Sequence, residues 1–166
     1  MKPPPLVLPP TKKPSSPALT AATLLDRPAG ARAGLAGARV LIVEDDQDCR
    51  ELIRTFLERA GATVRCVDSV AAAMDCVYRS FDPDVVLTDY SMPVANGLEL
   101  IRQFRRAPSS RAIAVPILVI SGHSEENWRA RSLAAGAADL LTKPFDPAVL
   151  VTRIAAAVAP GRSGPH

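Results

Sequence analysis

Two hydrophobic patterns alternate along the chain from about residue 39 onward. Short runs of apolar, often β-branched residues, such as Val40-Leu41-Ile42-Val43, have the length and composition of buried strands. Between these runs, apolar residues recur every three or four positions, which is the spacing of one face of a helix. Strands are predicted over residues 40–43, 63–67, 85–88, 116–120 and 138–142. Helices are predicted over residues 49–60, 70–78, 96–104, 124–135 and 147–158.

The alternation of five strands with five helices predicts an α/β fold. Gly61 and Gly136 follow predicted helix ends, and Asp146 with Pro147 suits the start of the last helix. Parallel strands need crossover helices, and these crossovers are right-handed, so the helices cover both faces of the sheet. We therefore expect a doubly wound parallel sheet with five helices.

The two ends of the chain differ from this central part. Residues 1–38 hold half of the sixteen prolines, together with Ala and Gly, and show little periodic apolar pattern. Such a segment buries too little surface to offset the entropy of ordering it, so we interpret it as a disordered leader, or alternatively as a docking peptide. A flexible tail is predicted over residues 159–166, which leaves 39–158 as the folded domain.

The net charge of +3 does not indicate a nucleic-acid-binding domain. Residues 1–38 have five basic residues and one acid, whereas residues 39–166 have fifteen basic and sixteen acidic residues and a charge of −1. No basic helix with interleaved aromatic residues is present in the folded part, so we expect no binding of nucleic acid.

Two further classes find no support in the sequence. There is no run of eighteen apolar residues and no signal segment, so we expect a cytoplasmic protein without membrane insertion. Cys49, Cys66 and Cys76 lack the spacing of a zinc site or a disulfide framework, and we interpret them as buried structural thiols.

Polar residues stand where the predicted strands end. Glu44, Asp45 and Asp46 follow the first strand, Asp89 follows the third, Ser121 follows the fourth and Lys143 follows the fifth. In doubly wound sheets, ligands bind beyond the carboxyl ends of the strands. We therefore expect these side chains to form one site.

Carboxylates gathered at one edge repel each other unless a cation lies among them. Mg²⁺ prefers oxygen ligands and one or two carboxylates, so Asp45 and Asp89 with a backbone carbonyl suit it. Lys143 could pair with Asp89 or with phosphate oxygens, and Ser121 could donate its hydroxyl to a phosphate. This set fits phosphoryl transfer to an aspartate nucleophile.

Four segments resemble the signature blocks of the response-regulator receiver family, and the likeness extends over residues 39–158. The segments are 41–46 (LIVEDD), 85–93 (VVLTDYSMP), 120–122 (ISG) and 141–145 (LTKPF). The resemblance implies a flavodoxin-like sheet with strand order 2-1-3-4-5.

The same resemblance implies a role for each residue at the edge. Asp89 would be the phosphoacceptor, and Asp45 a direct Mg²⁺ ligand. Glu44 would act largely through bound water, and Ser91 would bind the ion through its backbone carbonyl. Ser121 would be the switch hydroxyl and Lys143 the cation that pairs with phosphate, with a cis peptide bond between Lys143 and Pro144.

Two features depart from the family pattern. The family usually has an aromatic residue three positions before the lysine, but this chain has Leu140, which puts aromatic gating of the output face in doubt. The connection that includes residues 108–112 is also slightly longer than usual.

The sequence leaves two interpretations open for the roles of several residues. Asp46 either joins the acidic site or caps the following helix. Ser91 and His123 could tune how fast water reaches the acyl phosphate, although His123 could equally be an exposed loop residue. Trp128 is either a partly exposed anchor for a partner or a residue at the edge of the core.

The leading functional hypothesis is a signalling module rather than an enzyme, because the only reactions expected are its own phosphorylation and dephosphorylation. It would take the phosphoryl group from a sensor histidine kinase or a histidine phosphotransfer protein, and it would alter binding of a downstream protein through the surface formed by the last two helices and the last strand. A phosphorelay intermediate or phosphate sink is one alternative. A Mg²⁺-dependent phosphatase is another, although such enzymes need an acid where Ser91 stands. Homodimerisation stays open.

Overall fold

The computed structural model describes residues 34–79, 81–122 and 127–158. The predicted tail at 159–166, the predicted leader up to residue 33, and His123 lie outside the described residues. The strands are β1 (Arg39–Val43), β2 (Thr63–Val67), β3 (Val85–Asp89), β4 (Ile117–Ser121) and β5 (Asp139–Thr142). The helices are α2 (Gln47–Arg59), α3 (Val70–Arg79), α4 (Gly97–Arg105), α5 (Ser110–Ala114), α6 (Trp128–Ala135) and α7 (Pro147–Val158).

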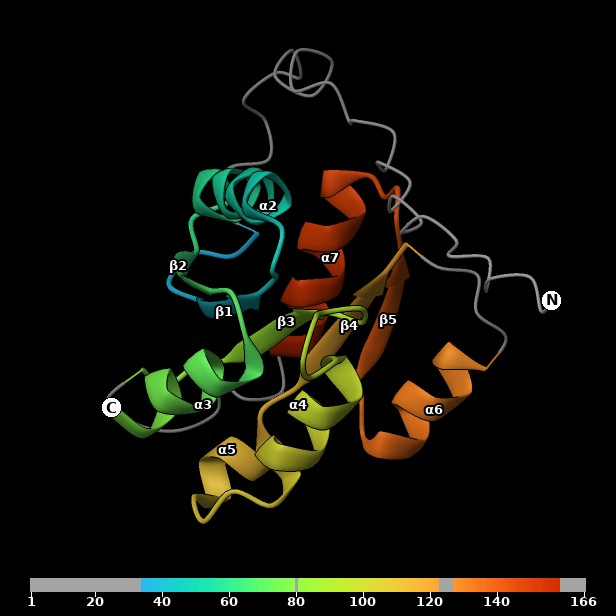
Figure 1. Ribbon diagram of the computed structural model, residues 1–166. Helices are drawn as coiled ribbons and strands as arrows, with labels where there is room; N and C mark the ends of the chain where they lie inside the picture. Colours follow the sequence, from blue (N-terminus) through green and yellow to red (C-terminus); the bar gives the residue numbers. More distant parts are fainter. Residues whose placement is uncertain (1–33, 80, 123–126, 159–166) are drawn as a thin grey trace, which may run out of the picture.

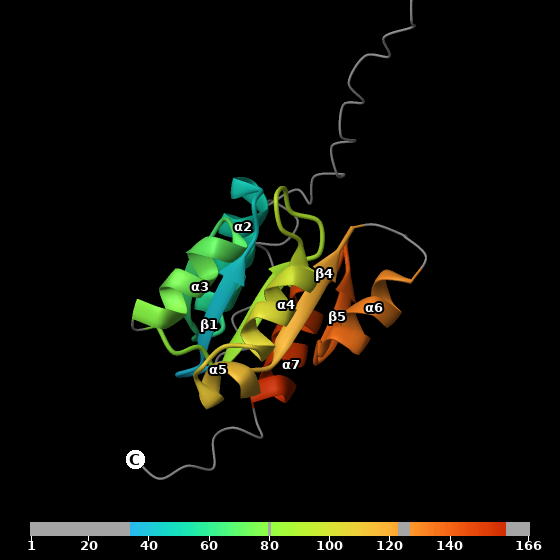
Figure 2. The ribbon, with the colours of Figure 1, turned by 60° about the horizontal axis from the view of Figure 1, so that its bottom comes forward.

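The five strands form one sheet in the order β2-β1-β3-β4-β5, and every neighbouring pair is parallel. Helices α2 and α7 cover one face, and α3, α4, α5 and α6 cover the other (Figure 1). Figure 2 shows α3 and α4 lying across the strands on that second face. The doubly wound α/β fold and its strand order are confirmed. None of the helices formed by the described residues is long and apolar enough to cross a membrane.

The prediction of five helices was short by one. The additional helix, α5, has five residues and lies in the connection that includes residues 108–112. It begins after Ser109, whose side chain accepts a hydrogen bond from the backbone N–H of Ala112. A helix this short has no apolar periodicity to detect, and only Ala112 is buried.

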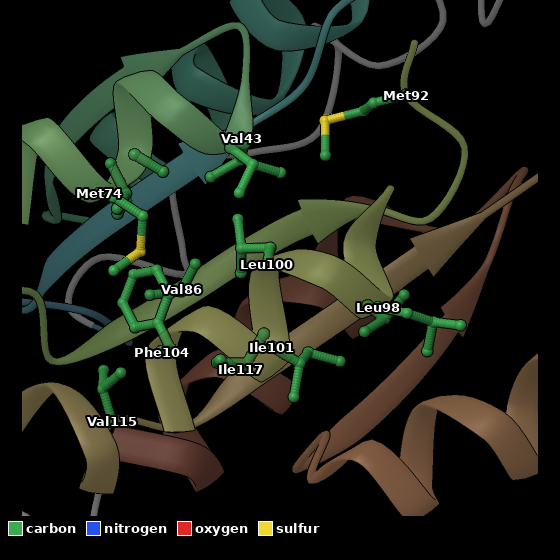
Figure 3. Packing of buried hydrophobic residues seen from close by; sticks show 14 of the residues in the cluster. Val43, Met74, Val86, Met92, Leu98, Leu100, Ile101, Phe104, Val115 and Ile117 are labelled. Atoms are coloured by element: carbon green, nitrogen blue, oxygen red, sulfur yellow. The ribbon is translucent and has the colours of Figure 1, made fainter. Parts of the chain in front are cut away.

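The central strands are apolar on both faces because each face packs against helices. In β1, Leu41 and Val43 belong to the cluster under α3 and α4, whereas Val40 and Ile42 belong to the cluster under α2 and α7. Figure 3 shows the first cluster, in which Phe104 from α4 lies among side chains of the sheet and of α3. Two filled layers hold the strands, and therefore the strand ends, in a fixed register.

The folded body begins before Arg39. Residues 34–38 form a turn, and the side chain of Leu35 is 2% exposed in the cluster under α2 and α7. The backbone N–H of Leu35 donates to Ala60 O at 3.1 Å, and Gly37 N–H donates to Gly61 O at 3.3 Å. Gly61 has a φ of 96° and lies against Ala36, where a Cβ would approach the Ala36 Cα within 3.2 Å. One buried leucine has no periodic partner in the sequence, which is why the pattern placed these residues in the leader.

The burial of Leu35 predicts that this turn contributes to folding stability. We expect Leu35→Ala to lower the free energy of unfolding by about 3 kcal/mol, the typical cost of truncating a buried leucine. Urea unfolding followed by circular dichroism measures this, with Leu133→Ala, at a side chain 54% exposed, as the control. Equal losses for the two variants would show that residues 34–38 are not part of the cooperative unit.

Candidate functional site

Three carboxylates meet at the carboxyl edge of the sheet. Glu44, Asp45 and Asp89 each offer an oxygen within 4.8 Å of the others. β1 and β3 are neighbours with Val43 opposite Thr88, so the residues that follow, Glu44 and Asp89, also come side by side. Glu44 is 3% and Asp89 8% exposed, so two of the three acids are largely removed from water.

Lys143 binds two of these acids at once. Its Nζ donates to Glu44 Oε2 at 2.8 Å and to Asp89 Oδ1 at 2.9 Å. The lysine follows β5, and its backbone N–H donates to Ser121 O at 2.8 Å, which continues the β4–β5 pairing by one residue. The Lys143–Pro144 peptide bond is cis, as predicted. The strand order therefore delivers an ammonium group from the sheet edge to carboxylates at its centre.

The cluster raises the pKa of both Glu44 and Lys143, for different physical reasons. Burial, together with the charge of Asp89, raises the pKa of Glu44, and Lys143 only partly opposes this. Burial acts to lower the pKa of Lys143, but the carboxylates of Asp89 and Glu44 outweigh it and raise that pKa above its ordinary value. Lys143 thus stays a cation, while the negative charge around it exceeds what one ammonium group neutralises.

Asp89 has a second donor on its other oxygen. The backbone N–H of Ser91 donates to Asp89 Oδ2 at 3.0 Å. Ser121, the last residue of β4, is fully buried at the same edge, and the preceding Ile120 accepts a hydrogen bond from Tyr90 N–H at 2.7 Å. The structure thus gathers Glu44, Asp45 and Lys143 around Asp89, with Ser91 in the loop after β3 and Ser121 at the end of the neighbouring strand β4.

Arg50 contacts the acidic turn and was not anticipated from the sequence. Its guanidinium donates to Glu44 O at 2.6 Å and to Asp45 O at 3.4 Å. Because these are backbone carbonyls, the contact fixes the path of the turn rather than neutralising a carboxylate. Asp46, one residue on, is the N-cap of α2 and accepts from Cys49 N–H at 2.8 Å, so of its two readings the structure favours the cap.

Cys49 lies beside the charged cluster but is unsuited to nucleophilic chemistry. Burial raises the pKa of its thiol to about 12, and the neighbouring charges of Lys143 and Glu44 act in opposite directions. The thiol therefore stays protonated at neutral pH, and a protonated thiol is a poor nucleophile. All three cysteines are free, and each is partly buried rather than fully buried as predicted.

The loop from β3 to α4 forms the wall of a cavity beside the acids. The cavity has a volume of about 460 Å³, and its lining includes Asp45, Ser91 and Asn96. Val94 in this loop has a φ of 70°, a left-handed conformation that strains a β-branched residue. The loop is held nonetheless, because Met92 is buried and Gly97 N–H donates to Tyr90 O at 3.0 Å.

A divalent cation fits the donor set. Glu44, Asp45 and Asp89 offer carboxylate oxygens, and the Ser91 carbonyl is near enough in sequence to Asp89 to add another. All are hard oxygen ligands of the kind that Mg²⁺ prefers, and a cation would offset the excess negative charge around Lys143. The acids can therefore serve both to hold a metal and to present Asp89 as a nucleophile.

Comparison with known proteins places this arrangement in a family. Residues 40–155 match the sequence model of the response regulator receiver domain. The phosphate regulon transcriptional regulatory protein PhoB of Pseudomonas aeruginosa is 34% identical over 131 residues, covering 79% of this chain and 55% of PhoB. The cell cycle transcriptional regulator CtrA of Caulobacter vibrioides is 33% identical, covering 72% of this chain and 50% of CtrA. The chain thus spans about half the length of these relatives.

Solved structures agree with the sequence relatives. The receiver domain of a signal transduction histidine kinase from Syntrophus aciditrophicus has a TM-score of 0.71 and 26% identity, covering 78% of this chain and 96% of that one. The receiver domain of the sensor histidine kinase PA1611 from Pseudomonas aeruginosa has a TM-score of 0.67 and 28% identity, covering 75% and 99%. The latter was solved with a magnesium ion coordinated in its active site cleft.

The raised pKa of Glu44 predicts a pH-dependent loss of stability in metal-free protein. The folded state holds this proton more tightly than the unfolded chain, so its contribution is complete below the ordinary Glu value of 4.5 and disappears as the pH rises through the raised pKa. Glu44→Gln should remove this loss while keeping an acceptor for Lys143. The test is to measure urea midpoints in EDTA across that pH range, with the exposed Glu51→Gln as the control. Parallel pH profiles for the wild type and Glu44→Gln would contradict the prediction.

Gly97 gives a second prediction about the site. A Cβ on Gly97 would lie 2.8 Å from Asp89 O, whereas a Cβ on Gly122, at the same edge, would meet nothing nearer than 3.8 Å. We expect Gly97→Ala to lower the free energy of unfolding by about 2 kcal/mol, because overpacking forces the backbone at Asp89 to move. Gly122→Ala should be close to neutral in the same urea titration, and equal behaviour of the two variants would refute this explanation.

Proposed function

Because the chain belongs to the response regulator receiver domain family, we propose that Asp89 accepts a phosphoryl group from a phosphohistidine donor with the help of Mg²⁺. The observation that carries the proposal is the position of Lys143 Nζ, within 3 Å of both Glu44 and Asp89. A sensor histidine kinase or a histidine phosphotransfer protein is the donor class that the family implies. We place the reaction in the cytoplasm.

The chemistry needs a carboxylate that remains nucleophilic beside an incoming anion. A carboxylate oxygen of Asp89 forms the new bond to phosphorus as the bond from phosphorus to the imidazole nitrogen of the donor breaks. Lys143 offsets the negative charge on the transferred group, and the Ser91 N–H keeps the aspartate oriented. Mg²⁺, bound by Asp45, Asp89 and the Ser91 carbonyl, with Glu44 acting largely through water, would supply further charge neutralisation.

Phosphorylation would act as a switch by changing the partners of these groups. The phosphoryl oxygens on Asp89 would compete with the Glu44 carboxylate for the ammonium group of Lys143. They would also offer an acceptor to the hydroxyl of Ser121 at the end of β4. Both changes favour one of two pre-existing conformers of the face formed by α6, β5 and α7. The downstream partner, a protein rather than a nucleic acid in this proposal, would bind that face with altered affinity.

Leu140 takes the place of the usual aromatic residue in this switch. Its side chain is 6% exposed and belongs to the core cluster that also contains Trp128 and Tyr90. A buried leucine has no ring to swing between two positions. We propose that the movement of α6 as a unit, rather than rotation of an aromatic side chain, carries the signal.

The geometry of the site does not favour the alternative of a phosphatase. That chemistry needs an acid two residues after the nucleophile, and the position is taken by Ser91, whose backbone N–H is used on Asp89. The proposal therefore limits turnover to the phosphorylation and dephosphorylation of Asp89 itself. Output through a partner, relay to another protein and phosphate storage share this same chemistry.

Phosphorylation of Asp89 can be tested directly. Incubation with Mg²⁺ and acetyl phosphate, or with a histidine kinase, should add one alkali-labile phosphoryl group, measured by intact-mass spectrometry. Asp89→Asn should abolish the modification, and EDTA should prevent it. Asp46→Asn, which can still cap α2, is the matched control and should retain it. A label that survives Asp89→Asn would defeat the proposal.

A further inference from the structure

The cavity beside the acidic cluster has a cationic wall. Asp45 and Arg131 are the two charged residues that line it, and they approach it from different elements. Asp45 lies in the turn after β1, whereas Arg131 lies in the second turn of α6. The remaining lining comes from Tyr90, Asn96 and loop residues 91–93. Arg131 is therefore the cationic residue nearest to hand for an anion that enters this cavity.

The position of Arg131 is set by a buried aromatic contact. Trp128, three residues earlier on α6, is 4% exposed, and its ring centroid lies 5.8 Å from that of Tyr90, the residue after Asp89. Ser132, four residues after Trp128, is fully buried, so these two residues mark the inner face of the helix. Arg131 lies beside that face, at the border between core and solvent, and this border adjoins the cavity.

Arg131 also differs from most other arginines of the described part in being exposed without a side-chain partner there. Eight arginines donate their guanidinium groups to oxygen atoms. These are Arg50, Arg54, Arg79, Arg102, Arg105, Arg111, Arg129 and Arg153. Within the described ranges, Arg131 has no ion pair and no side-chain hydrogen bond, so its five donors are available to a ligand.

The inner side of the site already serves the transferred phosphoryl group. Lys143 and the Ser91 N–H each donate to one oxygen of the Asp89 carboxylate, and one of these two oxygens is the attacking atom. Because attacking and leaving atoms are roughly in line, the leaving group must point away from Asp89 into the cavity. Arg131, which lines this cavity, is therefore on the side of the leaving group, and the planar donors of a guanidinium group match a carboxylate.

We infer that Arg131 is a specificity-determining residue that binds the leaving carboxylate of small acyl phosphate donors. The inference rests on the proposed phosphorylation of Asp89. With acetyl phosphate, an Asp89 oxygen forms a bond to phosphorus while the bond from phosphorus to the acetyl oxygen breaks, and the bonding electron pair leaves with acetate. No proton is required, and the acetate anion departs beside Arg131. A donor that releases a neutral amine presents no such anion.

The test compares two donors on the full chain. The second-order rate constant for Asp89 phosphorylation is measured with acetyl phosphate and with phosphoramidate, which releases ammonia, at saturating Mg²⁺. We expect Arg131→Gln to lower the acetyl phosphate rate about tenfold, as for loss of a charge-assisted hydrogen bond. The phosphoramidate rate should change less than about twofold. Arg131→Lys should fall between these, since lysine keeps the charge but loses the planar fork.

Controls separate this role from general effects of charge and folding. Arg59→Gln removes the same charge from the far end of α2 and should leave both rates unchanged. Mg²⁺ affinity by calorimetry and the urea midpoint should be the same for Arg131→Gln and the wild type. An equal fall with both donors, or no fall with acetyl phosphate, would overturn the role of Arg131 while leaving Asp89 as the phosphoacceptor. Failure of wild-type protein to react with either donor would instead reject the proposed function.

Discussion

The site depends on one partly buried ammonium group shared between two buried carboxylates. Lys143 lies within hydrogen-bond distance of Glu44 and Asp89, although 99 and 54 residues of chain separate it from them. A buried charge is costly without a partner, and two adjacent buried carboxylates repel each other, so each of the three groups needs the other two. The strand order satisfies this requirement by bringing β1, β3 and β5 to a common edge. The excess negative charge that remains explains why the same edge suits a divalent cation.

Hydrogen bonds to the backbone, a glycine and hydrophobic packing hold Lys143, Glu44 and Asp89 in place from the surrounding structure. Arg50 holds the turn after β1 by its carbonyl oxygens. Gly97 permits α4 to begin against the backbone of Asp89, where a side chain has no room. The two hydrophobic layers fix the strands whose ends carry the acids. Folding stability and the geometry of the site are thus linked at this edge. Gly97 lets α4 pack closely against the backbone of Asp89, and this close packing also restricts how that backbone can move.

Much of this arrangement could be predicted because it follows from patterns of local sequence. Apolar runs of strand length, with polar residues at their ends, were enough to place Asp89 and Lys143 at one edge, and the parallel topology brought Glu44 to them. Other features carried no periodic signal. Helix α5 is a single turn capped by Ser109, and Leu35 is one apolar residue in a segment rich in Pro, Ala and Gly. Both depend on tertiary packing, which sequence periodicity does not report.

The open readings were decided by tertiary contacts as well. Trp128 proved to be a core residue because the ring of Tyr90 lies against it, and nothing in the spacing of α6 indicates that pairing. The roles of Arg50 and Arg131 could not be anticipated for a similar reason. An arginine on an amphipathic helix is ordinarily a solvated residue. Arg50 and Arg131 differ from the rest only because a loop lies beside each of them in the fold, the turn after β1 for Arg50 and residues 91–93 for Arg131. His123 lies outside the described residues, so its two readings stay as they were.

The contact between Tyr90 and Trp128 has a practical consequence. The chain has a single tryptophan, Trp128, and its indole lies against Tyr90, the residue that follows the proposed phosphoacceptor Asp89 in the sequence. Any shift of α6 relative to the end of β3 alters the surroundings of this one chromophore. The fold therefore contains its own optical probe, whose emission can be followed in unlabelled protein without a second indole obscuring it.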